Sequence, residues 1–231
     1  MSMTAGDVTR GRPPAAPVER LRITFAVTGS ACYIGHLDLA RAWVRALRRL
    51  QLPVAYTHGY NPRPRLSIAA PLPVGFAGEQ ELLEALFDSP VDPQALTQRL
   101  LSELPNGLAL RGIEKVSLQA PPLPSQVIAA DYVVSFFEPP PTDLPQRVEH
   151  LMATASIPFT RIRQGKKTHF DLRPRILKAQ VPRRDGQAIL ILRLAHGPGG
   201  AARPEDVLEA LGLEVGNARI TRTGLVLAGE P

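Results

Sequence analysis

Hydrophobic and polar positions along the chain predict an α+β protein. Apolar and polar residues alternate through Leu21–Val27, which is typical of a strand with one buried face, and a further strand is predicted at Leu108–Val116. Between these strands, apolar residues recur every three to four positions from about His36 to Leu50, which predicts an amphipathic helix. A second helix is predicted from Pro93 to about Leu104, with Asp92 as its N-cap.

The remaining segments complete two similar series of elements. Short extended segments near Val54–Tyr56 and Leu66–Ile68 and a strand at Glu81–Phe87 give the first half the order β-α-β-β-α-β. The second half repeats this order without sequence identity to the first. Its predicted elements are a strand at Tyr132–Phe137, a helix from Thr142 or Asp143 to about Ala155, a basic hairpin of Thr160–Arg163 and His169–Leu172, a strand at Ile189–Leu194, a helix at Arg203–Leu211 and a strand at Arg219–Leu227. The order is that of a ferredoxin-like unit, so we expect two tandem ferredoxin-like units.

The predicted boundaries follow from composition. Residues 1–19 are polar and rich in proline and alanine and are expected to form a flexible tail, 20–118 the first unit and 126–231 the second, with a linker at 119–125 that contains three prolines. The start of the chain lacks the apolar region of a secretory signal, and no segment approaches the roughly 18 apolar residues of a membrane span. We expect a cytoplasmic protein without membrane contact.

Charge is distributed unevenly along the chain, whose formal net charge is +6. From Leu39 to Gly78 there are six arginines and no acidic residue. From Arg161 to Arg184 there are nine basic residues and one acidic residue, Asp171. Basic blocks of this kind favour a polyanionic partner.

The first basic block begins on the predicted helix. Arg41, Arg45, Arg48 and Arg49 fall on a different face from the predicted apolar stripe, and no acidic residue lies three or four positions from the last three of them. The predicted apolar stripe consists of Leu37, Ala40, Trp43, Val44, Leu47 and Leu50. The arginine face fits either an ordinary solvated surface or a surface that contacts phosphate groups.

The block continues in the loop Gly59–Ser67. Prolines 62 and 64 fix their own φ angles and favour an extended backbone, in which Arg63 and Arg65 point the same way. Two guanidinium groups beside Tyr60 suit phosphate and a stacked base. Tyr60 fits base stacking and the covering of a strand end equally well, and Asn61 fits either reading of a base edge or an Asx-turn.

These segments carry a resemblance to a known family. The quoted stretches are Thr28-Gly29, Tyr33-Ile34-Gly35-His36-Leu37-Asp38-Leu39 with Arg41, Ala46-Leu47-Arg48-Arg49, Leu52-Pro53, Gly59 to Ser67, Leu72-Pro73-Val74-Gly75, and Lys166-Lys167 with Asp171-Leu172-Arg173-Pro174. Over about residues 20–185 the chain resembles a radical-SAM-linked bacterial domain of unknown function, which occurs fused to B12-binding-type radical-SAM proteins or as a separate chain. The resemblance implies a role in RNA metabolism, because separate members are encoded near genes for ribonuclease G and ribosomal proteins.

Catalytic chemistry has few candidates in the sequence. Cys32 is the single cysteine, which excludes an internal disulfide and the three-cysteine cluster motif of radical-SAM enzymes. His36, at a helix start, could act as general base toward a ribose 2′-OH, as in metal-independent endoribonucleases of tandem ferredoxin-like type, whose glycine-rich loop the stretch Gly197–Gly200 resembles faintly. No metal site and no cofactor is predicted.

The sequence therefore predicts an RNA-binding adaptor that recruits RNA, ribosomal or transfer, for modification or processing. A metal-independent endoribonuclease and a protein-only partner of a radical-SAM enzyme remain alternatives, and the expected partners are RNA and a radical-SAM protein or ribonuclease. The basic helix, the proline-rich loop and the second basic hairpin are expected to form one groove. The predicted RNA-binding residues are Arg41, Arg45, Arg48, Arg49, Tyr60, Asn61, Arg63, Arg65, Lys166, Lys167 and Arg173.

Overall fold

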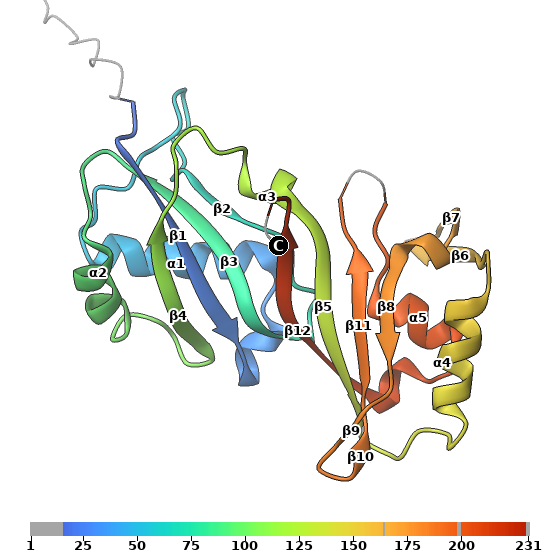
Figure 1. The fold of residues 1–231 in the computed structure, drawn as a ribbon. Helices are drawn as coiled ribbons and strands as arrows, with labels where there is room; N and C mark the ends of the chain where they lie inside the picture. The colour runs from blue at the N-terminus through green and yellow to red at the C-terminus, as the bar shows by residue number, and fades with distance from the viewer. Residues whose placement is uncertain (1–15, 164, 198–199, 230–231) are drawn as a thin grey trace, which may run out of the picture.

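A computed structural model describes residues 16–163, 165–197 and 200–229 and confirms the α+β class (Figure 1). Residues 1–15 of the predicted tail and residues 198 and 199 of the glycine-rich stretch lie outside the described residues. The first strand already includes Glu19, which is buried, and the N–H of Val18 donates to the carbonyl of Phe87 at 2.9 Å.

One mixed sheet of eight strands runs through the molecule. Seven strands follow the order β4-β1-β3-β12-β5-β11-β8, and β2 pairs with β3 beside this path. These strands are β1 (Glu19–Val27), β2 (Leu66–Ile68), β3 (Ala77–Phe87), β4 (Leu108–Lys115), β5 (Val127–Phe136), β8 (Ile176–Gln180), β11 (Leu190–Ala195) and β12 (Ala218–Leu227). Two hairpins stand apart, β6 (Pro158–Arg163) with β7 (Lys166–Asp171) and β9 (Arg183–Arg184) with β10 (Gln187–Ala188).

The helices lie toward the two ends of this sheet. In Figure 1, α1 crosses behind β1 and β3, whereas α4 and α5 lie beside β8 and β11. The α-helices are α1 (His36–Arg49), α2 (Pro93–Leu100), α3 (Leu123–Gln126), α4 (Leu144–Ala153) and α5 (Pro204–Ala210), and 3-10 turns occupy Gly29–Tyr33, Arg173–Arg175 and Val215–Asn217. The helix predicted to reach Leu104 ends at Leu100. Lys166 and Lys167, which lie between the two predicted strands of the basic hairpin, instead begin β7.

The two halves of the sheet meet where β12 pairs in parallel with β3, Thr221 opposite Ala77 and Arg222 opposite Gly78. Arg222 is buried here, and its guanidinium forms a two-point ion pair with Glu81, with Nε donating at 2.8 Å. A Cβ at position 78 would lie 2.7 Å from the Glu81 side chain, so glycine leaves room for this pair. The sheet is therefore continuous across the predicted domain boundary.

The core includes the sheet face under α1. The rings of Trp43 and Phe25 meet edge to face with their centroids 4.9 Å apart, and both are fully buried. The predicted apolar stripe of α1 is wrong in part, because Leu37 is 69% exposed and Val44 is only half-buried. The buried residues within the helix are Leu39, Ala42, Trp43, Ala46 and Leu47. Ala42 and Ala46 thus belong to the buried face, whereas Leu37 and Val44 do not.

The predicted linker is held to the sheet. Arg20 is buried, bonds to Glu84 in β3 and also donates to the carbonyl groups of Ala120 at 2.6 Å and Pro121 at 2.8 Å. Leu123 in α3 is fully buried against Ala69, Val127 and Leu227. The segment 119–126 therefore packs as part of the fold.

Candidate nucleic-acid interface

Residues 55–65 form a narrow projection at the edge of the sheet, which we call the arm. Tyr56 and Pro64 pair as an antiparallel bridge. The N–H of Thr57 donates to the carbonyl of Arg63, and that of Arg65 to the carbonyl of Ala55, both at 2.8 Å. The Thr57 hydroxyl accepts from the N–H of Arg63 at 2.9 Å. The arm is therefore braced by backbone hydrogen bonds, as in a hairpin.

Tyr60 lies at the tip of the arm and is 100% exposed. It therefore covers no strand end, and base stacking stays a prediction. Gly59, which precedes it, adopts φ +122°, a backbone conformation that favours glycine. Asn61 is also exposed, and its side chain makes no hydrogen bond to any described residue, so the Asx-turn is absent there.

Arg63 and Arg65 follow on the returning side of the arm. Arg63 is exposed and Arg65 half-buried, and neither guanidinium has a hydrogen-bond or ion-pair partner within the described ranges. Because side chains alternate along extended backbone, both arginines project from the side of the arm opposite Pro64 and its bridge partner Tyr56. Two positive charges therefore share one side of the arm.

The other side of the arm borders α1. The Nε–H of Arg48 donates to the Tyr56 hydroxyl at 3.1 Å, and its guanidinium carbon lies 5.9 Å from the ring centroid. No described carboxylate pairs with Arg48. Arg45, one turn earlier, is exposed and has no partner in the part of the chain that the structure describes. The basic helix and the arm are therefore neighbours, as the sequence suggested.

Two of the four helix arginines do have counter-ions. Arg41 pairs with Asp38 at 2.9 Å, and both side chains are well exposed. Arg49 pairs with Glu103 at 2.5 Å and also donates to the Glu103 backbone carbonyl. A search for acidic residues three or four positions away on the helix could not find Glu103, because Glu103 lies 54 residues from Arg49. The uncompensated cations of this surface are Arg45, Arg48, Arg63 and Arg65.

The second basic block mainly makes contacts within the fold. Arg173 donates to the carbonyl of Met152 at 2.8 and 3.1 Å and to that of Ile176 at 3.0 Å, which occupies its guanidinium. Asp171 accepts from the N–H groups of Ile157 at 2.8 Å and Arg173 at 3.0 Å, and the first of these bonds lowers the pKa of Asp171. Asp171 thus fixes the backbone at Arg173 rather than its guanidinium.

An aromatic ring holds two further arginines of this block. The guanidinium carbons of Arg161 and Arg175 lie 4.8 and 4.1 Å from the centroid of Phe170. Arg161 also forms a two-point ion pair with the buried Asp206 in α5. Lys166 and Lys167 are exposed and unpaired among the described residues.

The two basic regions lie at opposite ends of the molecule (Figure 1). The arm and α1 are on the β1–β3 side of the sheet, whereas the β6–β7 hairpin lies beyond β8, near α4, with β12, β5 and β11 between them. The expected single groove of helix, loop and hairpin is therefore not formed within one chain. Each half of the chain carries a basic block, but no local pattern determines how the two halves are joined.

His36 stands at the first position of α1 and is half-buried. Its Nδ1 atom is buried and has no hydrogen-bond partner among the described residues. No described carboxylate or hydroxyl orients the ring, as a catalytic base requires. Burial raises the pKa of the Cys32 thiol, which does not favour a thiolate nucleophile. The described ranges also contain no group of three or more metal-ligating side chains.

The fold and the arm define the class: an α+β protein with a cationic, tyrosine-tipped projection on a continuous sheet. The sequence then places it in a family. Residues 20–204 match the family described as "Uncharacterized protein conserved in bacteria (DUF2344)", and the chain belongs to this family. This confirms that the chain belongs to a bacterial family of unknown function, whereas the link to radical-SAM proteins stays a prediction. No curated protein matches the chain. Within the described residues, no helix is long and apolar enough to span a membrane.

Proposed function

We propose that the protein binds RNA through the arm and the adjoining surface of α1. The observation that carries this proposal is the fully exposed Tyr60 at the tip of a hydrogen-bonded projection. A tyrosine ring held entirely in water exposes apolar surface without any folding benefit, whereas it gains stacking energy against an unpaired base. Arg63 and Arg65 on one side and Arg48 on the other are placed to contact the flanking phosphates.

This arrangement favours unpaired or loop RNA over a regular duplex. Sequence recognition in RNA mostly uses splayed bases that stack on aromatic side chains, since the major groove of an RNA duplex is too narrow for side chains. An arm with one aromatic residue at its tip and cations on both sides suits insertion into a loop or bulge. Asn61, beside the ring, supplies an amide that can pair with a base edge.

We propose an adaptor role for this binding. His58 lies on the arm two positions before Tyr60, but it is exposed and no described carboxylate or hydroxyl orients its ring. We therefore assign the chemistry to another protein. The resemblance to the radical-SAM-linked domain suggests a modification enzyme or a ribonuclease as that protein. Lys166 and Lys167, at the other end of the molecule, are available as a second contact for a long RNA.

We propose further that each half of the sheet is one ferredoxin-like unit. The support is the order of strands: β4-β1-β3 with β2 in the first half and β12-β5-β11-β8 in the second. Each set comes from a β-α-β-β-α-β series along the chain, with the β6–β7 and β9–β10 hairpins as additions to the second.

The test is titration of the protein with a fluorescein-labelled stem–loop RNA and with the matching duplex, over a series of salt concentrations. We expect tighter binding of the stem–loop. Combined Arg63→Ala and Arg65→Ala substitution should weaken its binding at least about tenfold, because a hydrogen bond to a charged group contributes roughly 1.5–3 kcal/mol. The slope of log affinity against log salt should fall by about 1.4, the value for two phosphate contacts on a single strand.

The matched control is the Arg111→Ala and Lys178→Ala double variant, which removes the same charge from exposed positions on β4 and β8. If both double variants lose affinity equally, binding depends on net charge alone and the arm is not the site. If the unmodified protein shows no RNA affinity even at low salt, the proposed function is wrong.

A further inference from the structure

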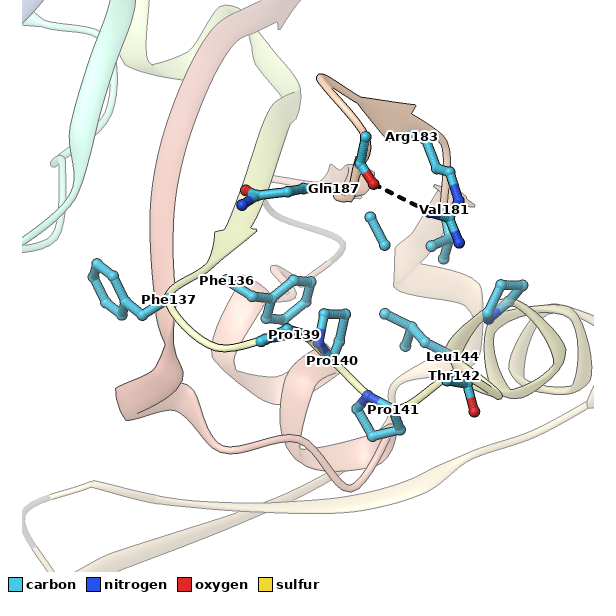
Figure 2. A pocket seen from close by; sticks show the side chains of 13 residues that line it. Phe136, Phe137, Pro139, Pro140, Pro141, Thr142, Leu144, Val181, Arg183 and Gln187 are labelled. Atoms are coloured by element: carbon cyan, nitrogen blue, oxygen red, sulfur yellow. Dashed lines mark hydrogen bonds between the residues drawn. The ribbon is translucent and has the colours of Figure 1, made fainter.

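An apolar pocket of about 300 Å³ lies at the edge of the second half of the sheet, far from the arm (Figure 2). One wall is the segment Phe136–Pro141, which begins with the last residue of β5, and the opposite wall includes Val181 and the β9–β10 hairpin. In Figure 2, Phe136 points into the space between these walls, while Phe137 points away from it. This size lies at the lower end of the range for ligand sites, roughly 300–1,000 Å³.

Both walls are fixed by local structure. Three successive prolines, 139 to 141, keep their part of the first wall extended and have no N–H groups, so this part cannot join the sheet. The Asn217 side chain holds this wall by accepting from the N–H of Glu138 at 2.8 Å and donating to its carbonyl at 3.2 Å. The second wall turns at Asp185 and Gly186, both with positive φ, as in a tight two-residue hairpin. The pocket is therefore preformed.

The lining chemistry is apolar with one charge. Arg183 is the only ionisable side chain in the lining. Its NH1 group donates to the carbonyl of Gly186 at 3.1 Å, which fixes the guanidinium at the rim and leaves its other donors without a described partner. The other polar side chains of the lining, Thr142 and Gln187, point away from the space between Phe136 and Leu144.

We propose that this pocket is a docking site for an acidic segment of a partner protein, which inserts one large apolar or aromatic side chain. The volume accommodates a single side chain of that kind, and Phe136 and the prolines offer flat apolar surfaces against which it packs. A carboxylate one or two residues from the inserted side chain pairs with Arg183 at the rim. The exposed Phe137, over which Arg219 lies at 5.6 Å, extends the contact surface.

A nucleotide fits this pocket less well than a peptide does. The edges of a nucleobase carry several hydrogen-bond donors and acceptors, and inside the pocket these groups would lose water without gaining partners. An apolar side chain has no such groups to satisfy. The proposal therefore goes beyond RNA binding by the arm and does not depend on it.

The experiment is a methyl-NMR titration of the full chain that follows Leu144, Val181 and Ala188. The first probe is a synthetic heptapeptide with a central tryptophan between Asp and Glu. A second peptide has Lys in place of both acidic residues, and a third has Ala in place of the tryptophan. The fourth probe is uridine monophosphate. We expect the acidic tryptophan peptide to shift these methyl signals and the alanine peptide to bind at least about tenfold more weakly. The Lys peptide should bind up to about fivefold more weakly, as for a partly exposed ion pair.

The matched variants are Arg183→Ala and Arg184→Ala, adjacent residues of β9 of which only the first lines the pocket. Only Arg183→Ala should abolish the preference for the acidic peptide. The proposal is overturned if no peptide shifts these signals, if uridine monophosphate shifts them more strongly, or if both arginine variants behave alike. Shifts that depend on the concentration of the protein alone would identify a second copy of the chain as the occupant and would equally overturn it.

Discussion

Arginine has two contrasting environments in this protein, at the centre of the sheet and on the arm. Arg222 is 1% exposed, pairs with Glu81 in two-point geometry and donates to the carbonyl of Ala70 at 2.9 Å. Burial lowers the pKa of Arg222, but the hydrogen bond and charge of Glu81 outweigh burial, so the pKa is raised overall and the group stays charged. Arg63, by contrast, is exposed and has no side-chain partner among the described residues.

The contrast shows that charge alone does not mark a binding site. A buried pair fixes how strands meet, because removing either partner leaves an isolated charge in an apolar environment. An exposed arginine without a partner contributes almost nothing to folding and is free to bind an anion. The number of basic residues in a segment does not distinguish an arginine that stabilises the fold from one that can bind an anion. The burial of the side chain and its interaction partners do.

The largest effect should come from breaking the central pair. Arg222→Met leaves Glu81 buried without a partner and should lower the free energy of unfolding by roughly 3–5 kcal/mol. Urea unfolding followed by circular dichroism measures this. The double variant Arg222→Met with Glu81→Leu should recover most of the loss, because no charge is then buried alone. Loss of stability without recovery in the double variant would show that shape, rather than charge, dominates the junction.

A smaller effect, on binding only, is expected at the arm tip. Tyr60→Ala should weaken binding of the stem–loop RNA by roughly 1–3 kcal/mol, the range for loss of one base stack. Tyr60→Phe keeps the ring and should bind nearly as well as the unmodified protein. The melting temperature should not change, since Tyr60 packs against nothing. A Tyr60→Ala variant with full affinity would show that the ring does not stack.

Arg45 and Arg49, which lie one turn apart on α1, should distinguish an arginine that binds RNA from one that stabilises the fold. Arg49→Ala loses its contacts to Glu103 and should lower stability by roughly 0.2–1 kcal/mol, as for an exposed pair, with little effect on RNA. Arg45→Ala should weaken RNA binding and leave stability almost unchanged. Parallel urea unfolding and RNA titration of both variants check this, and the same pattern in both would remove the distinction between paired and unpaired arginines on α1.

The smallest effect concerns pH. Burial, helped by the nearby charge of Arg222, lowers the pKa of His196 from the 6.5 of an ordinary histidine. The unfolded chain therefore binds more protons than the folded chain once the pH falls below about 6.5, so stability should decrease on acidification. His196→Gln should reduce this loss between about pH 7 and pH 5 in urea unfolding. An unchanged pH dependence would assign it to other groups.

The sequence predicted individual elements far better than their assembly. The helix at His36 and the strands β1, β3 and β4 appear close to their expected positions, because local patterns determine them. The predicted buried stripe of α1 was wrong in part, because hydrophobicity favoured Leu37 and Val44, whereas the buried face includes Ala42 and Ala46. Nothing local could predict that Arg222 pairs with Glu81, 141 positions earlier.

In the candidate site, too, local features were predictable and tertiary contacts were not. The arm was predictable as a stiff cationic segment because prolines and arginines act locally, and its contact with α1 agrees with the prediction. The proposed role of Arg173 in RNA binding stays a prediction, but its guanidinium is directed to the carbonyl groups of Met152 and Ile176. Such contacts depend on the tertiary fold, which no charge pattern encodes.

The position of β12 between β3 and β5 has a consequence for synthesis on the ribosome. β3 leaves the exit tunnel early, yet part of its edge remains uncovered until β12 follows, more than a hundred residues later. At roughly 5–20 residues per second, this interval is on the order of ten seconds. During that time Glu81 has no counter-ion from β12, so the nascent first half is exposed to association with other chains until the last strand closes the sheet.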